Sequence, residues 1–208
     1  LTAGTNLPNG VIIHYFLPNF NKDNDQVKVS IHSTDGTLIK EFSNKSKENT
    51  LKVKKGGNSF VWNMKYSGAK RLASMVLWGA DFSGAKAVPG DYIVKLKVND
   101  TEMTQEFTIH KDPTSEGSID DIKAQFDFVN EINGVVDRAH KAIENIRNMK
   151  KDLKKFQSDY ADNDSAKDLI EDSKSIVESI DKIENALYQT KNQSNQDPLN
   201  YGVRLTNN

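Results

Sequence analysis

Residues 10–109 alternate hydrophobic and polar side chains over several short runs, with the period of two that is typical of half-buried β-strands. Asp35-Gly36 lies between two such runs and predicts a tight hairpin, because glycine accepts the positive φ of the turn. The runs that indicate strands are 10–17, 27–31, 37–42, 51–53, 60–64, 92–98 and 103–109. About seven short strands at this spacing predict an immunoglobulin-like β-sandwich over residues 1–112.

Both tryptophans of the chain fall in this half. Trp62 alternates with Phe60 and Met64, so we expect it in the core of the sandwich. The stretch 66–89 has no regular alternation, and Trp78 within it is expected to cover one end of the core. Trp78 is also the better exposed aromatic candidate for contacting a ligand such as a sugar.

The period changes after Asp112-Pro113, where apolar residues recur at spacings of three and four, as on one face of an α-helix. Ser118 with Asp121 offers a helix start, and the polar run 162–164 interrupts the pattern. The sequence predicts helices over about 118–160 and 165–191, then a polar C-terminal tail. The apolar positions are Ile122, Phe126, Val129, Ile132, Val136, Ala139, Ile143, Ile146, Leu153 and Phe156, then Leu169, Ile176, Ile180, Ile183 and Leu187.

Two helices joined by a short polar turn are expected to lie antiparallel, as a helical hairpin over residues 113–208. The predicted fold class is therefore α+β in two parts. A two-helix hairpin seldom buries enough apolar surface to be stable alone, so its stripe needs a further surface. That surface is a third helix beyond Asn208, the sandwich, or a second copy in a homodimer. Gly134, inside the first helix, marks a kink or a close packing point.

Composition narrows the classes of function. The 208 residues carry a formal net charge of −1, which argues against nucleic acid or an anionic membrane as an obligatory partner. The chain has no cysteine, which excludes disulfides, thiolate metal sites and cysteine nucleophiles. No apolar run is long enough to span a membrane. Because the sequence starts at Leu1, we read it as a fragment of a longer protein.

One loop has the spacing of a calcium site. Asn19, Asn21, Asp23 and Asp25 place oxygen-bearing side chains at every second position. The glycine that permits the sharp turn of a calcium loop and the closing glutamate are both missing. A solvated loop between strands is the favoured interpretation, and calcium is the alternative.

No arrangement typical of a catalytic site stands out. The four histidines are scattered, although His14 and His32 are able to meet across strands. Carboxylate pairs such as Glu171-Asp172 and Asp120-Asp121 lie on helix faces beside lysines, which favours solvation and local ion pairing. A Lys-rich run at 150–155 also has acidic neighbours, as on a solvated helix face. We predict a chain that is not an enzyme and binds no cofactor; a hydrolase is the least favoured alternative.

Five short motifs carry a family resemblance. They occur, in this order, as Thr5-Asn-Leu-Pro-Asn-Gly-Val-Ile12, Asp35-Gly-Thr37, Phe60-Val-Trp-Asn-Met64, Pro89-Gly-Asp-Tyr92 and His110-Lys-Asp-Pro113. Together they resemble the C-terminal region of bacterial sortilin-like proteins with Asp-box β-propellers, often labelled glycosyl hydrolases. In that family, a sandwich similar to fibronectin type III domains follows the propeller, and a helical segment closes the chain.

The resemblance implies a non-catalytic accessory module of a larger secreted, periplasmic or cell-surface protein. Its partner would be the upstream propeller domain of the same polypeptide. The alternative function is a carbohydrate- or surface-binding module. Two features depart from the family: the sequence stops where family tails continue into another helix, and it holds no propeller repeat. The run Ser33-Thr-Asp-Gly-Thr37 lacks the Trp of an Asp-box, so the hairpin-turn interpretation is preferred there.

Overall fold

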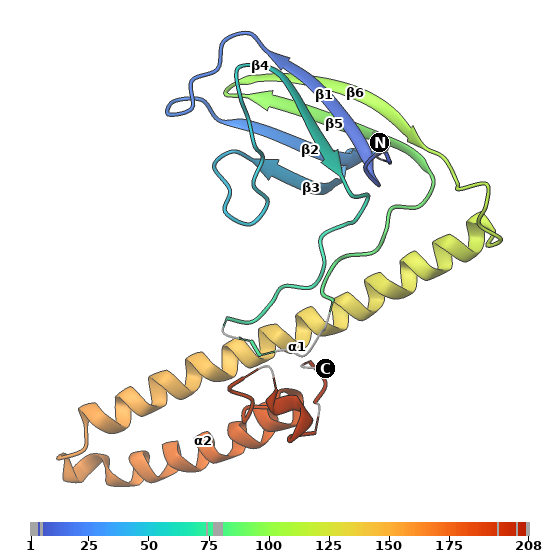
Figure 1. Ribbon diagram of the computed structural model, residues 1–208. Helices are drawn as coiled ribbons and strands as arrows, with labels where there is room; N and C mark the ends of the chain where they lie inside the picture. The colour runs from blue at the N-terminus through green and yellow to red at the C-terminus, as the bar shows by residue number, and fades with distance from the viewer. Residues whose placement is uncertain are drawn as a thin grey trace. The chain divides into compact units, whose positions relative to one another are not determined.

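The computed structural model describes residues 4, 6–73, 75–76, 81–194, 196–202 and 204–206, and its elements are shown in Figure 1. The chain divides into two compact units. The β unit comprises residues 1–67 and 83–129, and the helical unit comprises 68–82 and 130–208. The fold class is α+β, with six antiparallel strands in two sheets followed by two packed long helices. In the described part of the chain, no helix is long and apolar enough to cross a membrane.

The strands of the β unit are β1 (Val11–Leu17), β2 (Val27–Ser33), β3 (Leu38–Ser43), β4 (Gly56–Trp62), β5 (Gly90–Val98) and β6 (Thr101–Ile109). They form a two-stranded sheet, β1-β4, and a four-stranded sheet in the order β3-β2-β5-β6. The Asp35-Gly36 turn joins β2 to β3, with Gly36 at φ 86°. This confirms the predicted hairpin.

The strand expected at 51–53 is not present. A single bridge joins Ser43 to Thr50, and Lys54 is held by the side chain of Asn58, which accepts from its N–H at 2.9 Å and donates to its carbonyl at 2.8 Å. Leu51 is nevertheless buried in the core. The alternation at 51–53 therefore indicates burial and not a hydrogen-bonded strand. Irregular segments can also bury apolar side chains in a core.

Trp62 is fully buried, as predicted. Its ring makes edge contacts with Tyr92 at 6.0 Å and Phe107 at 6.3 Å between centroids. The indole N–H donates to the carbonyl of Lys65 at 3.1 Å, so the only polar atom of the ring has a partner. Residues of both sheets pack around this ring, which makes it the centre of one half of the β core.

The two predicted helices are confirmed as α1 (Ile119–Asp159) and α2 (Lys167–Leu187), with short 3₁₀ turns η1 (Asp164–Ala166) and η2 (Asp197–Leu199). Ser118 and Asp121 cap α1 reciprocally: the Ser118 hydroxyl accepts from the Asp121 N–H, and the Asp121 carboxylate accepts from the Ser118 N–H. Asn163 accepts from the Ser165 N–H and caps the 3₁₀ turn before α2. α2 ends at Leu187, short of the expected 191, because the residues after it enter a folded tail.

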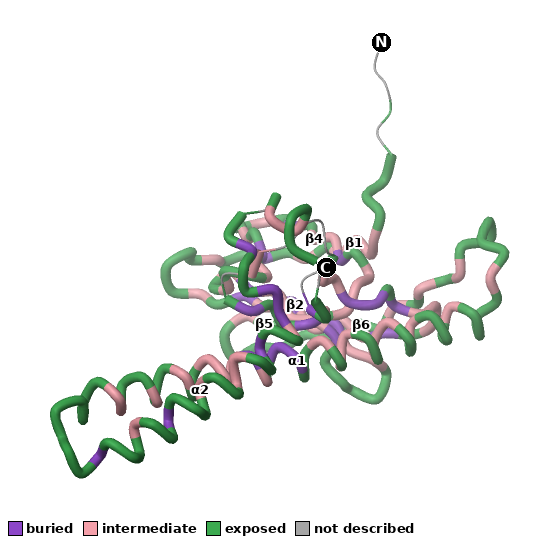
Figure 2. Tube along the Cα trace, turned by 90° about the horizontal axis from the view of Figure 1, so that it is seen from below, coloured by how far each residue is buried: buried purple, intermediate pink, exposed green. Residues whose placement is uncertain are grey.

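In the helical unit, α1 and α2 pack along a seam with alternating spacings of three and four, the a and d positions of a heptad repeat. The buried and half-buried seam residues are Ala139, Ile143, Ile146, Lys150, Leu153 and Gln157 of α1, and Ile170, Ser173, Val177, Ile180, Glu184 and Leu187 of α2. Polar seam residues meet each other, since the amide of Gln157 donates to the hydroxyl of Ser173 at 2.9 Å. Figure 2 shows that most of the surface of the hairpin is exposed.

Candidate functional site

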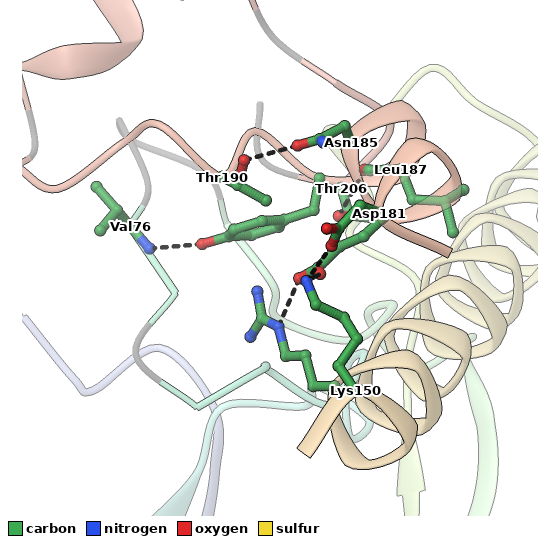
Figure 3. A network of polar contacts seen from close by, with 10 residues as sticks. Val76, Lys150, Asp181, Asn185, Leu187, Thr190 and Thr206 are labelled. Carbon is green, nitrogen blue, oxygen red and sulfur yellow. Dashed lines mark hydrogen bonds and ion pairs between the residues drawn. The ribbon is translucent and has the colours of Figure 1, made fainter. Parts of the chain in front are cut away.

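A buried carboxylate lies in the seam of the hairpin. Glu184 is 3% exposed. Its Oε1 accepts from Nε of Arg147 at 2.7 Å, and its Oε2 accepts from Nζ of Lys150 at 3.0 Å. Lys150 also forms an ion pair with Asp181. Figure 3 shows Lys150 of α1 pointing toward Asp181 of α2. We call Arg147, Lys150, Asp181 and Glu184 the Glu184 cluster.

The surroundings of Glu184 and Lys150 favour the charged form of both side chains. Burial works to raise the pKa of Glu184, but hydrogen bonds and charge from Arg147 and Lys150 outweigh it, so this pKa lies below its ordinary value. Burial works to lower the pKa of Lys150, but Asp181 and Glu184 hold it above its ordinary value. General acid–base catalysis favours a pKa near the working pH. The cluster is therefore suited to fixing the helix pair rather than to moving protons.

The base of the hairpin is covered by described residues of segment 68–82, which the structure describes at 68–73, 75–76 and 81–82. Leu72 and Met75 of this segment pack against Ile143 and Leu187, and Tyr188 belongs to the same hydrophobic cluster. The backbone N–H of Val76 donates to the hydroxyl of Tyr188 at 3.3 Å (Figure 3). The irregular stretch 66–89 thus contains a segment that packs with the helices, a role the sequence did not predict.

Polar contacts fasten the same segment and the C-terminal tail. The backbone N–H of Lys70 donates to Asp137 at 2.6 Å, and the Lys70 carbonyl lies 2.5 Å from Nδ1 of the buried His140. In the tail, the N–H and hydroxyl of Thr206 both donate to the carbonyl of Leu187 at the end of α2. These contacts close one end of the hairpin.

A second apolar stripe on the hairpin is largely exposed, with only Ala142 and Phe156 of its members half-buried. It occupies the g position of the heptad on both helices, directly beside the seam. Its members, which we call the outer stripe, are Val135, Ala142, Met149 and Phe156 of α1 and Leu169, Ile176 and Ile183 of α2. Met149 is 50% exposed and Leu169 is 59% exposed. In an antiparallel pair, the g positions of both helices lie on the same side, so these residues form one face.

The β unit has two hollows. One, of about 780 Å³, lies between β1 and β6, and we call it the β1 groove. It is lined by Val11, Ile12, Ile13, His14, Tyr15, Phe16, Val94, Leu96, Met103, Thr104, Gln105 and Phe107. The other, of about 840 Å³, lies on the outer face of the β1-β4 sheet between Phe16 and His14 on one side and Lys52 and Lys54 on the other. Gly57 forms part of its floor.

The loop proposed for calcium has a structural explanation of its own. Asp25 accepts from the N–H of Asn21 at 2.7 Å and from the amide of Asn99 at 2.9 Å, and these hydrogen bonds lower its pKa. Asn21 in turn accepts from the N–H of Asp23. The ammonium of Lys45 donates to the carbonyls of residues 22 and 23, each at 3.1 Å. An ammonium group of the chain itself therefore contacts the backbone carbonyl oxygens of this loop. Asn19 is exposed.

The other candidate residues are dispersed. Trp78, the aromatic ligand candidate, lies outside the described residues. His32 contacts the carbonyl of Gly36 and the hydroxyl of Ser30, so both of its ring nitrogens have protein partners. Asp121 caps α1, and Glu171 pairs with Lys174 at 3.4 Å. Among the residues that the structure describes, no three or more histidines, aspartates or glutamates are grouped to hold a metal ion.

Sequence reasoning missed the Glu184 cluster, the separation of the outer stripe from the seam and the role of segment 68–82. It did count Phe156, Leu169, Ile176 and Ile183 among the apolar positions of the helices. A heptad assignment would have revealed the first two, because it places a glutamate in the seam and apolar residues beside it. Nothing local marks the third. Comparisons of the chain with protein-family models, with curated proteins and with solved structures found no match.

Proposed function

We propose that this chain is a non-catalytic structural and interaction module whose helical hairpin associates with a second copy. The observation that carries the proposal is the outer stripe. In a two-stranded coiled coil, the positions that flank the seam usually hold charged residues such as Glu and Lys. Here the g positions of both helices are apolar over consecutive heptads. An apolar g position is expected where a helix pair packs against further helices.

A second copy fits the outer stripe in size. An antiparallel copy centred on Met149 would pair Met149 with itself and the small Ala142 with the large Phe156. Alternation of small and large side chains across facing layers lets them interdigitate. Each α1 would then lie in the groove between α1 and α2 of the other copy, which also covers Leu169, Ile176 and Ile183.

Charge favours the same antiparallel arrangement. The c positions flank the outer stripe on its solvent side, and along α1 they change from Arg138 to Asp152 and Asp159. An antiparallel copy places the basic end of this row beside the acidic end of its partner. A parallel copy would place like charges together, which is unfavourable.

Sedimentation equilibrium of the full chain tests the self-association. We expect a dimer, and we expect Met149→Glu and Ile176→Glu each to raise its dissociation constant at least about tenfold, with helix content unchanged in circular dichroism. Asn148→Glu, on an exposed position of α1 outside the stripe, is the matched control and should leave the dimer intact. A wild-type chain that stays monomeric at high micromolar concentration would contradict the proposal.

For the β unit, we infer an immunoglobulin-like sandwich of the fibronectin type III kind. Its sheet orders, β1-β4 and β3-β2-β5-β6, correspond to strands B-E and C′-C-F-G of such a sandwich. Tyr92, near the start of β5, donates its hydroxyl to the carbonyl of Val88 at 2.6 Å, four residues upstream. A tyrosine that bonds back in this way near the start of strand F is a hallmark of immunoglobulin-like domains. An experimental structure of the chain would test the assignment.

We further propose the accessory role that the family resemblance implies: a module attached to a β-propeller in a secreted, periplasmic or cell-surface protein of glycosyl hydrolase type. The five ordered motifs of the sequence support it. The coding sequence around this chain is the test. An upstream reading frame with repeated Asp-boxes is the expected result, and one without them contradicts this part of the proposal.

Carbohydrate binding is the second candidate function, and the hollow on the outer face of the β1-β4 sheet favours it. Phe16 is 66% exposed there, opposite Gly57 in the strand register, and Lys52 and Lys54 are exposed at the rim. An exposed ring beside ammonium groups suits an acidic sugar chain. Binding to an array of acidic glycans should be lost on Phe16→Ala and weakened by Lys52→Glu; binding that survives both substitutions would exclude this surface.

A further inference from the structure

β1 has an edge without a partner strand. On one side, all seven of its residues pair with β4. On the other side, in the part of the chain that the structure describes, neither a strand nor a backbone hydrogen bond from another segment reaches it. β6 likewise ends the four-stranded sheet. Unpaired N–H and C=O groups along such edges are ready to pair with another extended segment.

The β1 groove follows this free edge. Its lining includes every residue from Val11 to Phe16 without a gap. A groove over one face of a strand would meet only alternate residues, because successive side chains point to opposite faces. An uninterrupted run therefore means that the groove exposes the strand edge-on, with its main chain accessible.

The chemistry of the groove selects its occupant. None of its twelve lining residues is Asp, Glu, Lys or Arg, although such residues make up 27% of the chain. A charged side chain entering the groove would lose water without meeting a countercharge, which is costly. The lining therefore matches an uncharged segment and excludes a charged one.

One residue that lines the groove has a buried hydroxyl without a partner. Tyr15 lines the groove, and its Oη is buried without a hydrogen-bond partner among the described residues. Burial also raises the pKa of this phenol. Tyrosine hydroxyls usually find a partner when buried, and an unmet one costs stability. A main-chain or side-chain group of an inserted segment would supply it.

We propose that the β1 groove binds an extended, uncharged peptide segment of a protein partner, which adds to the sheet as a strand along the free edge of β1. Main-chain hydrogen bonds to β1 supply affinity, and alternate side chains of the segment fill the space over Val94, Leu96 and Met103. In an immunoglobulin-like sandwich, this position beside strand B belongs to strand A. The correspondence to strand A rests on the sandwich assignment proposed above. The free edge and the groove do not depend on that assignment.

Amide exchange measured by NMR on the full chain tests the proposal. The probe is a capped heptapeptide of alternating Thr and Val, and its control carries Pro in place of the central Val, which removes one N–H and cannot continue a ladder. With the probe at about 1 mM, we expect exchange of the amides on the free edge of β1 to slow at least about tenfold. The proline peptide should leave exchange unchanged.

Variants separate the groove from non-specific binding. Met103→Lys places a charge in the groove and should abolish the protection. Glu106→Gln, on the opposite face of β6, is the matched control and should keep it. Tyr15→Phe should weaken binding several-fold while the fold, checked by the remaining spectrum, is retained. No protection by the probe, equal protection by the proline peptide, or protection that grows with protein concentration alone, meaning a second copy in the groove, would each overturn the proposal.

Discussion

Glu184 carries a carboxylate into a position of the hairpin seam where an apolar residue is expected. Its burial is tolerated because two cations and their hydrogen bonds neutralise it. A buried ion pair of this kind contributes little to net stability but favours one register of α1 against α2. In a shifted register, the buried carboxylate would lose its cationic partners. The Gln157–Ser173 pair, about three turns of α2 from Glu184, adds a second polar match to the same register.

Acid should weaken the helical unit through Glu184. Because the pKa of Glu184 is lowered in the folded state, its contribution is present above the ordinary glutamate pKa of about 4.3 and is lost as pH falls through the lower folded value. Urea unfolding of the wild type should show this loss below about pH 4.3. Glu184→Gln should lower the free energy of unfolding by about 2–3 kcal/mol at neutral pH, less than for a fully buried ion pair because Arg147 is 36% exposed. It should also reduce the loss of stability as the pH falls. If the variant loses stability in acid as steeply as the wild type, Glu184 is not the cause of that loss.

Gly84 allows two backbone segments of the β unit to approach closely. A Cβ at this position would lie 2.3 Å from the carbonyl oxygen of Tyr66 and 2.6 Å from that of Ser67, so the backbone would have to move. The neighbouring hydrogen bond from the Tyr66 N–H to the Ala85 carbonyl, 2.9 Å long, holds these segments together. Gly84→Ala should therefore destabilise the chain by about 2 kcal/mol or more in urea unfolding. A change within about 0.5 kcal/mol would show that the segments separate easily.

At the scale of the element, α1 runs without interruption from Ile119 to Asp159 through Gly134. Of the two explanations that the sequence offered for this glycine, close packing is not what the structure shows. A Cβ here would meet only the tip of the Arg138 side chain, at 3.7 Å, which is an ordinary contact. Gly134 is therefore a weak point in the helix rather than a packing requirement.

Gly134→Ala should stabilise the chain. Alanine has a higher helix propensity than glycine by about 1 kcal/mol in a helix interior, and no neighbour has to move to admit the methyl group. Thermal unfolding followed by circular dichroism should show a higher midpoint. A lower midpoint would mean that α1 bends at Gly134 in solution.

For the whole molecule, the decisive contact is between segments far apart in the sequence. Segment 68–82 belongs to the helical unit, although it lies between β4 and β5 in the chain. It covers the base of the hairpin with Leu72, which is 4% exposed. The stability of the hairpin therefore depends on residues that precede it by about a third of the chain.

Leu72→Ala should loosen the base of the hairpin. Removing a buried leucine side chain costs about 2–5 kcal/mol, because it loses transfer free energy and leaves a cavity. Hydrogen exchange should show faster amides at the end of α2 and in the tail around Thr206. Lys52→Ala, an exposed position of the β unit, serves as the control. Unchanged protection at Tyr188 and Thr206 would contradict the covering role of segment 68–82.

Local patterns in the sequence determined most of the elements. Periods of two and of three to four identified six strands, the Asp35-Gly36 hairpin, both helices and the core position of Trp62, because burial of one face imposes those periods directly on the chain. The predicted run 60–64 overlaps β4 (Gly56–Trp62) only in part. The same logic failed at 51–53, where Leu51 enters the core from an irregular segment. Alternation reports which side chains are buried and says nothing of whether a neighbouring strand supplies hydrogen bonds.

Only the tertiary structure shows which distant segments of the chain contact each other. Segment 68–82 has no period, and its hydrogen-bond partners lie some 70 residues away in α1 and over 100 residues away, directly after α2, so no local signal marked its place. The pairing of Glu184 with Arg147 and Lys150, and the free edge of β1, likewise depend on how distant elements meet. The period of hydrophobic residues shows which face of a helix or strand is buried, but not which other element covers that face. Contacts between elements depend on complementary shape and charge, and only the folded chain brings the complementary surfaces together.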